Sequence, residues 1–279
     1  MTKTQSRSSH LEFRTVRRNI ILSLIAGVVI STSLVLFSPE KSTTFFGDTL
    51  RSISAGIAAI LSLIVVYRQK VDGLFGKAYA ALAIGISLWF IAELIWTYYE
   101  IGLGIETPFP SLADAFWLIG YGPFIYYMFK TYKLFIRRTK SIHIVAISAI
   151  ATILLAFYIY QIFISSDLSS IDGIVQFLVS IAYPIGDVIF IVPAILIILN
   201  SGKGELTSIP WIFLAMLITA IADSIFGFTS VANIAADRIW SPIYIAGYLV
   251  FAGGLFWYNR FFIVSDKPYA KGKKDGTLG

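Results

Sequence analysis

Apolar residues are arranged along this chain in long runs that short polar segments separate. An α-helix needs roughly 20 apolar residues to cross a hydrocarbon core about 30 Å thick. Eight runs come close to this length or exceed it, at residues 19–37, 50–67, 79–99, 111–134, 142–164, 173–199, 209–229 and 241–264. We therefore predict an all-α integral membrane protein with about eight transmembrane helices in a membrane domain of residues 19–264, and basic tails at 1–18 and 265–279.

The basic residues support this number of spans. If the N-terminus lies in the cytoplasm, 19 of the 22 Lys and Arg residues fall on the cytoplasmic side, and Lys41, Arg51 and Arg238 fall on the outer side. Lys and Arg concentrate on the cytoplasmic side of membrane proteins, and a missed helix would scramble the pattern. We predict a multi-pass protein of the plasma membrane with both termini in the cytoplasm.

Two segments recur in the second half of the chain. "IAELIW" at 91–96 matches "IADSIF" at 221–226, and "AFWLIGY" at 115–121 matches "PIYIAGY" at 242–248, with offsets of 130 and 127 residues. An even number of predicted spans separates the copies, so both copies run in the same direction. This indicates a 4+4 parallel internal repeat with halves at about 19–134 and 142–264. The alternative is a chance match within the limited residue alphabet of membrane helices.

Two acids lie at matching depth in these repeated spans. Glu93 follows Tyr79 by 14 residues, and Asp223 follows Ile209 by the same interval. At 1.5 Å per residue this is about 21 Å along a helix, which leaves both acids inside the membrane. Ionisable residues at such depth indicate a functional site, and a structural hydrogen bond is the alternative.

Further polar and aromatic side chains share helix faces with acids. Gln176, Ser180, Tyr183 and Asp187 follow one another at steps of four, three and four residues, and Trp89 and Trp96 flank Glu93 at helical spacing. Side chains at these spacings lie on one face of a helix. We predict an outward-facing acidic ligand pocket formed by Glu93, Asp223, Asp187, Tyr183, Gln176, Trp89, Trp96 and Arg51.

Asp114 has a simpler interpretation. It follows Ser111 by three residues at the start of a predicted span, and this spacing is typical of a capping box. We therefore predict that Ser111 and Asp114 cap this helix. Ser241 and Pro242 are expected to begin the last helix in the same way, with Asp237 outside it.

Several classes of protein are excluded by what the chain lacks. It has no Cys, its two histidines are His10 and His143, and no Lys lies in the middle of a predicted span. These absences argue against thiolate or His-rich metal sites and against a retinal Schiff base. We expect no metal and no cofactor. The net charge of +6 comes from short clusters between spans, so we expect no nucleic-acid partner.

The segments "PSLADAFWLIGYGPF", "AYPIGDVIF" and "IADSIF", in this order, resemble the multi-span N-terminal region of some bacterial GGDEF and EAL signalling proteins. The resemblance covers roughly residues 80–260 and implies a membrane sensor with a cytoplasmic signalling partner. This chain has no output domain after its last span, so we expect a stand-alone module. "GDVIF" and "ADSIF" are also similar to the YhhN-type membrane lysoplasmalogenases.

We therefore expect a membrane sensor or ligand-binding module with a small-molecule or lipid ligand, rather than an enzyme. Two alternatives remain open at this point. One is an intramembrane lipid hydrolase of the lysoplasmalogenase type, and the other is a small-solute or proton-coupled transporter.

Overall fold

The computed structural model describes residues 3–105, 109–132, 140–200, 208–231 and 237–263. These residues form helices joined by short connections, and no strand occurs among them, which confirms the predicted all-helical fold. The elements are α1 Lys3–Phe37, α2 Glu40–Gln69, α3 Gly73–Thr97, the π-helical turn η1 Tyr98–Gly102, α4 Leu112–Tyr132, α5 Ser141–Ser165, α6 Ile171–Asn200, α7 Ser208–Val231, α8 Asp237–Tyr258 and the π-helical turn η3 Asn259–Ile263.

Seven segments within the described part of the chain are long and apolar enough to cross a membrane. They are Thr15–Phe37, Glu40–Gln69, Gly73–Gly102, Ser141–Ser165, Ile171–Leu199, Ile209–Thr229 and Arg238–Phe261. The remaining predicted span is α4, a helix of 21 residues that contains Asp114 and Lys130. Its two charges and several tyrosines make it less apolar than its neighbours. The structure thus supports seven or eight candidate spans.

Helix α2 begins ten residues earlier than predicted, and this corrects the position of Arg51. Glu40 follows Pro39 and places an acidic side chain in the first turn, where the helix macrodipole favours negative charge. The N–H of Ser42 donates to the carbonyl of Pro39 at 2.8 Å and closes this turn. Arg51 therefore lies about three turns inside α2 and is 3% exposed, instead of lying at the outer membrane surface.

Helix boundaries also differ from prediction at both ends of the chain. α1 begins at Lys3, so most of the predicted tail at 1–18 is helical, whereas the described part of the chain ends at 263 and leaves the tail at 265–279 outside it. α8 begins at Asp237 instead of Ser241, and Pro242 lies inside it. Arg238 fixes this first turn by donating to the carbonyl of Ser38 at 3.0 Å.

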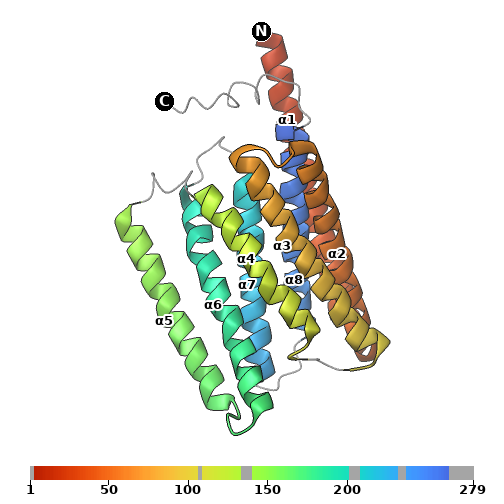
Figure 1. Ribbon diagram of the computed structural model, residues 1–279. Helices are drawn as coiled ribbons and strands as arrows, with labels where there is room; N and C mark the ends of the chain where they lie inside the picture. The colour runs from red at the N-terminus through yellow and green to blue at the C-terminus, as the bar shows by residue number, and fades with distance from the viewer. Residues whose placement is uncertain (1–2, 106–108, 133–139, 201–207, 232–236, 264–279) are drawn as a thin grey trace.

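The helices form one bundle in which consecutive helices run in opposite directions (Figure 1). α2 packs against α3 and α8, and α6 packs against α7, α5 and α4. The hairpins α3–α4 and α7–α8 have extensive interfaces, while α1 lies on α8. Small buried residues on α2, among them Ala55, Ala58, Ala59 and Ser62, let its neighbours approach closely. α5 lies at the edge of the bundle and packs mainly on α6 (Figure 1).

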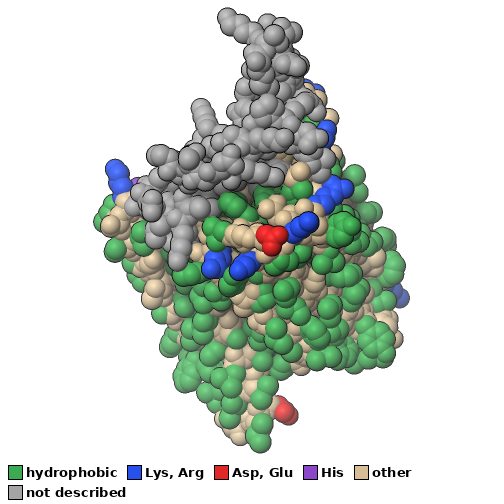
Figure 2. Space-filling view, turned by 45° about the horizontal axis from the view of Figure 1, so that its top comes forward, with side chains coloured by type: hydrophobic (Ala, Val, Ile, Leu, Met, Phe, Trp, Pro, Cys, Tyr) green, Lys and Arg blue, Asp and Glu red, His purple; other side chains and the backbone are tan. Residues whose placement is uncertain are grey.

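The two ends of the bundle differ in charge. At one end, Arg68 of α2 donates to the side chain of Asn259 at 3.1 Å, next to the end of α8. Helix direction places the following basic residues at or near this basic end: Arg17, Arg18, Arg68, Lys70, Lys77, Lys130, Lys140 and Arg260. Figure 2 shows Lys and Arg side chains at this end and hydrophobic side chains over the flank below them. The opposite end holds Lys41 and Arg238 among the described residues.

Candidate functional site

A cavity of about 320 Å³ lies inside the bundle. Side chains from α2 to α8 line it, and it reaches the surface at the turn between α5 and α6 through the exposed residues Ser165 and Asp167. This turn lies at the end of the bundle opposite the basic end. Seven of the eight side chains predicted for the pocket line this cavity: Arg51, Trp89, Glu93, Trp96, Gln176, Tyr183 and Asp223.

The eighth, Asp187, is 4% exposed and does not line the cavity itself. It accepts a hydrogen bond from Tyr121, which does. The carboxyl groups of Asp187 and Asp223 lie near each other at the α6–α7 interface. Two carboxylates close together repel each other, and a shared proton would relieve this repulsion. The structure thus brings Asp187 to the site through a neighbouring acid.

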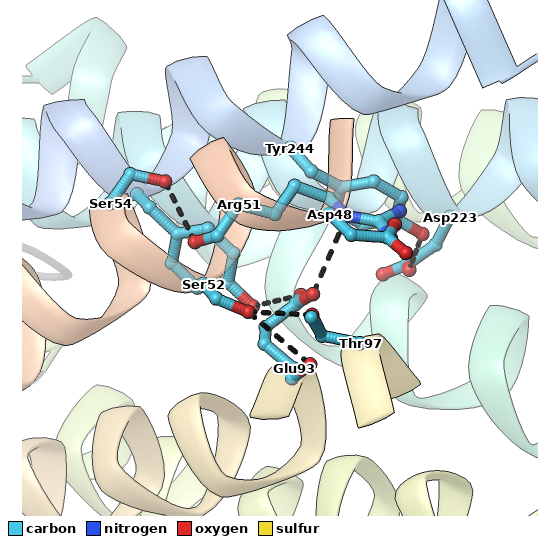
Figure 3. A network of polar contacts seen from close by, with 9 residues as sticks. Asp48, Arg51, Ser52, Ser54, Glu93, Thr97, Asp223 and Tyr244 are labelled. Carbon is cyan, nitrogen blue, oxygen red and sulfur yellow. Dashed lines mark hydrogen bonds and ion pairs between the residues drawn. The ribbon is translucent and has the colours of Figure 1, made fainter. Parts of the chain in front are cut away.

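Glu93 belongs to a buried charge cluster with Arg51 and Asp48. The Nε of Arg51 lies 3.5 Å from Oε2 of Glu93, and the guanidinium also pairs with Asp48, one turn earlier on α2. Figure 3 shows Arg51 between the two acids, with Tyr244 and Asp223 beside them. All three side chains are at most 3% exposed, so water cannot solvate their charges. The charges instead compensate one another.

Hydrogen bonds and a ring contact hold this cluster in place. The Ser52 hydroxyl donates to the backbone carbonyl of Glu93 at 3.3 Å and lies 2.8 Å from the Thr97 hydroxyl, which joins α2 to α3 (Figure 3). The guanidinium carbon of Arg51 lies 4.6 Å from the centre of the Trp240 ring on α8. Three helices therefore fix the position of the one cationic side chain among the described residues that line the cavity.

Four of the acids inside the bundle each accept a hydrogen bond from a tyrosine hydroxyl on another helix. The pairs are Tyr248 with Glu93 at 2.8 Å, Tyr121 with Asp187 at 2.7 Å, Tyr183 with Asp114 at 2.7 Å, and Tyr244 with Asp223. A buried carboxyl group without partners is costly, and a phenol supplies one strong donor while its ring fills apolar space. These four pairs, the acid–tyrosine pairs, connect α3, α4, α6, α7 and α8 around the cavity.

Asp114 takes part in both a cap and an acid–tyrosine pair. Its Oδ2 accepts from the Ser111 N–H at 2.6 Å, and the Ser111 hydroxyl accepts from the N–H of Ala113 at 3.2 Å. This hydrogen bonding is that of the predicted capping box. The other oxygen, Oδ1, accepts from Tyr183, and Asp114 also lines the cavity. The prediction of a cap alone therefore missed half of the contacts of Asp114.

Aromatic rings form the rest of the wall near Glu93. The ring centre of Trp96 lies 5.6 Å from that of Trp117 and 6.0 Å from that of Phe226. Trp89 donates its indole N–H to the carbonyl of Trp117 at 3.0 Å. The Trp96 N–H is buried and has no acceptor among the described residues. Trp96 therefore brings an unused hydrogen-bond donor to the cavity wall.

Asp167 lies at the rim, outside the apolar part of the bundle. Its Oδ1 accepts from the hydroxyl of Ser169 at 2.6 Å and from the N–H of Ser169 at 3.0 Å. These two hydrogen bonds favour the charged form and lower the pKa of Asp167 below its usual value. The rim of the cavity thus carries a negative charge at neutral pH.

Sequence reasoning missed Asp48 and three of the four tyrosine partners of the acids, Tyr121, Tyr244 and Tyr248, whereas Tyr183 was predicted for the pocket. Asp48 precedes the apolar run at 50–67, so the sequence pattern gave no reason to place it in the pocket. Tyr121 and Tyr248 end the two matching segments "AFWLIGY" and "PIYIAGY", so the repeat held a signal for them. Tyr244 had no such signal. Asp237, expected to lie outside the last helix, begins α8, but its side chain lies outside the described residues.

The site has the features of a binding pocket. It joins a polar inner surface to aromatic walls, and no group of three or more His, Cys, Asp or Glu residues in the described part of the chain could hold a metal ion. His143 does not line it. Searches against protein-family models, curated proteins and solved structures found no match to this chain.

Proposed function

We propose that this chain is a multi-pass membrane protein that binds a small molecule in the cavity, as a sensor or ligand-binding module. The observation that carries the proposal is the arrangement of the four acid–tyrosine pairs around one cavity of about 320 Å³. Acids inside a membrane domain are costly and mark functional sites, and binding pockets have this size and this mixture of aromatic walls with a few polar groups.

The charge at the two ends of the bundle supports an orientation. The basic end carries most of the described Lys and Arg residues, and such residues concentrate on the cytoplasmic side of a membrane. The basic end would then face the cytoplasm of the cell, as would both termini. The cavity reaches the surface at the opposite end, so its ligand would enter from outside.

Equivalent contacts in the two halves support a 4+4 parallel repeat. A Cβ atom on Gly120 would lie 3.5 Å from the carbonyl oxygen of Gly85, and a Cβ atom on Gly247 would lie 3.6 Å from that of Ala215. These positions are related by the offsets of 127 and 130 residues seen in the sequence. The pairing of α2 with α8 also corresponds to that of α6 with α4. In this repeat Glu93 and Asp223 occupy equivalent positions.

A cavity-filling substitution tests the proposal. Ser180 on α6 lines the cavity, so Ser180→Trp would fill part of it, while Ser224→Trp on the exposed face of α7 is the matched control. We expect native mass spectrometry in mild detergent to show a bound small molecule on the wild type and on the control, and its loss from Ser180→Trp. An identical set of bound masses on all three proteins would contradict the proposal.

The same experiment separates the alternatives. An intact lipid on the protein that is cleaved during incubation would favour the lipid hydrolase. Uptake of the bound molecule into sealed vesicles that contain the protein would favour the transporter. A bound molecule that is neither cleaved nor moved across the membrane supports the sensor or ligand-binding module, whose signalling partner would contact the cytoplasmic end.

A further inference from the structure

We infer that the cavity is built for an organic cation, an ammonium group with a hydrogen-bond acceptor close to it. This inference rests on the proposed function and names the chemical class of the ligand. The charged groups of the cavity wall are the first support for it. Among the described lining residues, Arg51 is the one cation, against Glu93, Asp114, Asp223 and the rim residue Asp167.

The charge of Arg51 is already compensated. Its guanidinium pairs with Asp48 and with Glu93, and it lies over Trp240. The carboxyl groups that line the cavity outnumber its one guanidinium, so a cation is the charge that the site can accommodate. Uncompensated charge in an apolar bundle is costly, and a bound cation would compensate it.

The aromatic wall favours an organic cation over a metal ion. Trp96, Trp117 and Phe226 pack together beside Glu93, and aromatic faces attract ammonium groups, with cages of such rings used for quaternary ammonium ligands. The described residues contain no group of ligands that could hold a metal ion. The wall therefore matches a cation that is large, weakly hydrated and partly apolar.

One buried polar atom independently indicates a ligand. The indole Nε1 of Trp96 has no hydrogen-bond partner among the described residues, although this side chain lines the cavity and is 2% exposed. Buried polar atoms are normally hydrogen-bonded, so each such exception needs an explanation. A ligand acceptor would use the Trp96 N–H, and the ammonium group would lie near the carboxylates.

Three probes of nearly equal shape test the charge. Choline, 3,3-dimethylbutan-1-ol and 3,3-dimethylbutanoate place a cationic, a neutral and an anionic group on similar frames. Four of the six tryptophans, Trp89, Trp96, Trp117 and Trp240, line the cavity, so binding can be followed by tryptophan fluorescence in detergent. We expect choline to bind at least tenfold more tightly than either of the other two probes.

Substitutions in and outside the cavity test whether choline binds there. Asp223→Asn should weaken choline binding about tenfold or more, while Asp172→Asn, an exposed acid on α6 outside the cavity, should leave it unchanged. Trp96→Phe keeps a ring and removes the donor. This variant should bind choline about threefold to tenfold more weakly than the wild type does. Tetramethylammonium has no hydrogen-bond acceptor, so its affinity should stay within about twofold of the wild-type value.

The possible outcomes are distinct. Equal binding of choline and its neutral analogue, stronger binding of the anion, or no binding by any probe would overturn the organic-cation inference. The loss of bound molecules from Ser180→Trp would still support the proposed function in those cases. If choline binds, competition by glycerophosphocholine at lower concentration identifies a lipid headgroup as the source of the ammonium, and failure to compete identifies a free amine. Both results agree with a cationic ligand.

Discussion

Helix α4 contains two glycines, Gly120 and Gly122, that offer a matched test of the packing around the cavity. A Cβ atom on Gly120 would lie 2.6 Å from Cδ1 and 2.7 Å from Nε1 of Trp89, whereas one on Gly122 would have no atom within 4 Å. Ordinary contacts of this kind are at least about 3.4 Å long, so Gly120→Ala requires a movement of roughly 0.8 Å. Trp89 cannot move freely, because it donates to the carbonyl of Trp117.

The cost follows from this overlap. Forcing extra methyl groups into a packed interior costs about 1–3 kcal/mol. The gain in helix propensity on replacing Gly by Ala, up to about 1 kcal/mol, applies to both positions and cancels in the comparison. Gly120→Ala should therefore be less stable than Gly122→Ala by about 1–3 kcal/mol. Each kcal/mol lowers the melting temperature by about 2–4 °C in chains of 150–250 residues.

Thermal unfolding in detergent micelles measures this difference. Circular dichroism at 222 nm follows the helices and does not depend on the fluorescence of Trp89 itself. A melting temperature of Gly120→Ala equal to or above that of Gly122→Ala would refute the reasoning, since it would mean that the α3–α4 interface can absorb a methyl group without cost.

Three further outcomes are expected. Ser170→Cys in this Cys-free chain should react with a membrane-impermeant maleimide in intact cells, and labelling that needs permeabilised cells would reverse the proposed orientation. Arg51→Met should lower the free energy of unfolding by about 3–5 kcal/mol, because it leaves buried acids such as Glu93 without their cation, while Arg51→Lys should cost less. The lowered pKa of Asp167 means that its hydrogen bonds to Ser169 stabilise the folded turn above pH 4 or so and are lost as the pH falls through the lower, folded-state pKa. A carboxyl NMR titration of Asp167 that gives a pKa at or above about 4 would contradict this.

The helices were predictable because each buries or exposes a long apolar surface, whereas the early start of α2 was not. The segment around Asp48, Arg51, Ser52 and Ser54 has the composition of a loop. In the structure Arg51 pairs with Asp48, Ser54 donates to the backbone carbonyl of Arg51, and Ser52 donates to a backbone carbonyl of α3. Their polarity is therefore satisfied inside the bundle. Such compensation depends on which helix lies opposite, and a linear pattern does not contain that information.

The same reason explains which parts of the site could be anticipated. Glu93 and Asp223 stood out because acids are rare at their depth. Their partners Tyr248 and Tyr244 did not, since the chain has 15 tyrosines and most could lie at a membrane interface. Which tyrosine reaches each acid depends on how α8 packs against α3 and α7. Sequence reasoning therefore located the acids and could not assign their hydrogen-bond donors.

The weak anchoring of α5 has a consequence for the energetics of binding. Only Ala151 and Ile162 of this helix are buried, yet Tyr158, Ile162 and Ser165 form part of the cavity wall. Tyr158 reaches α7 at Gly227, where a Cβ atom would lie 1.8 Å from its hydroxyl oxygen, so there is no room for a side chain at that contact. In a bilayer, most of the surface of α5 would be held by lipid tails, and lateral pressure would press this wall against the ligand. Ligand affinity would then vary with acyl-chain length and lipid packing, and the same protein would bind more tightly in a bilayer than in a loose micelle.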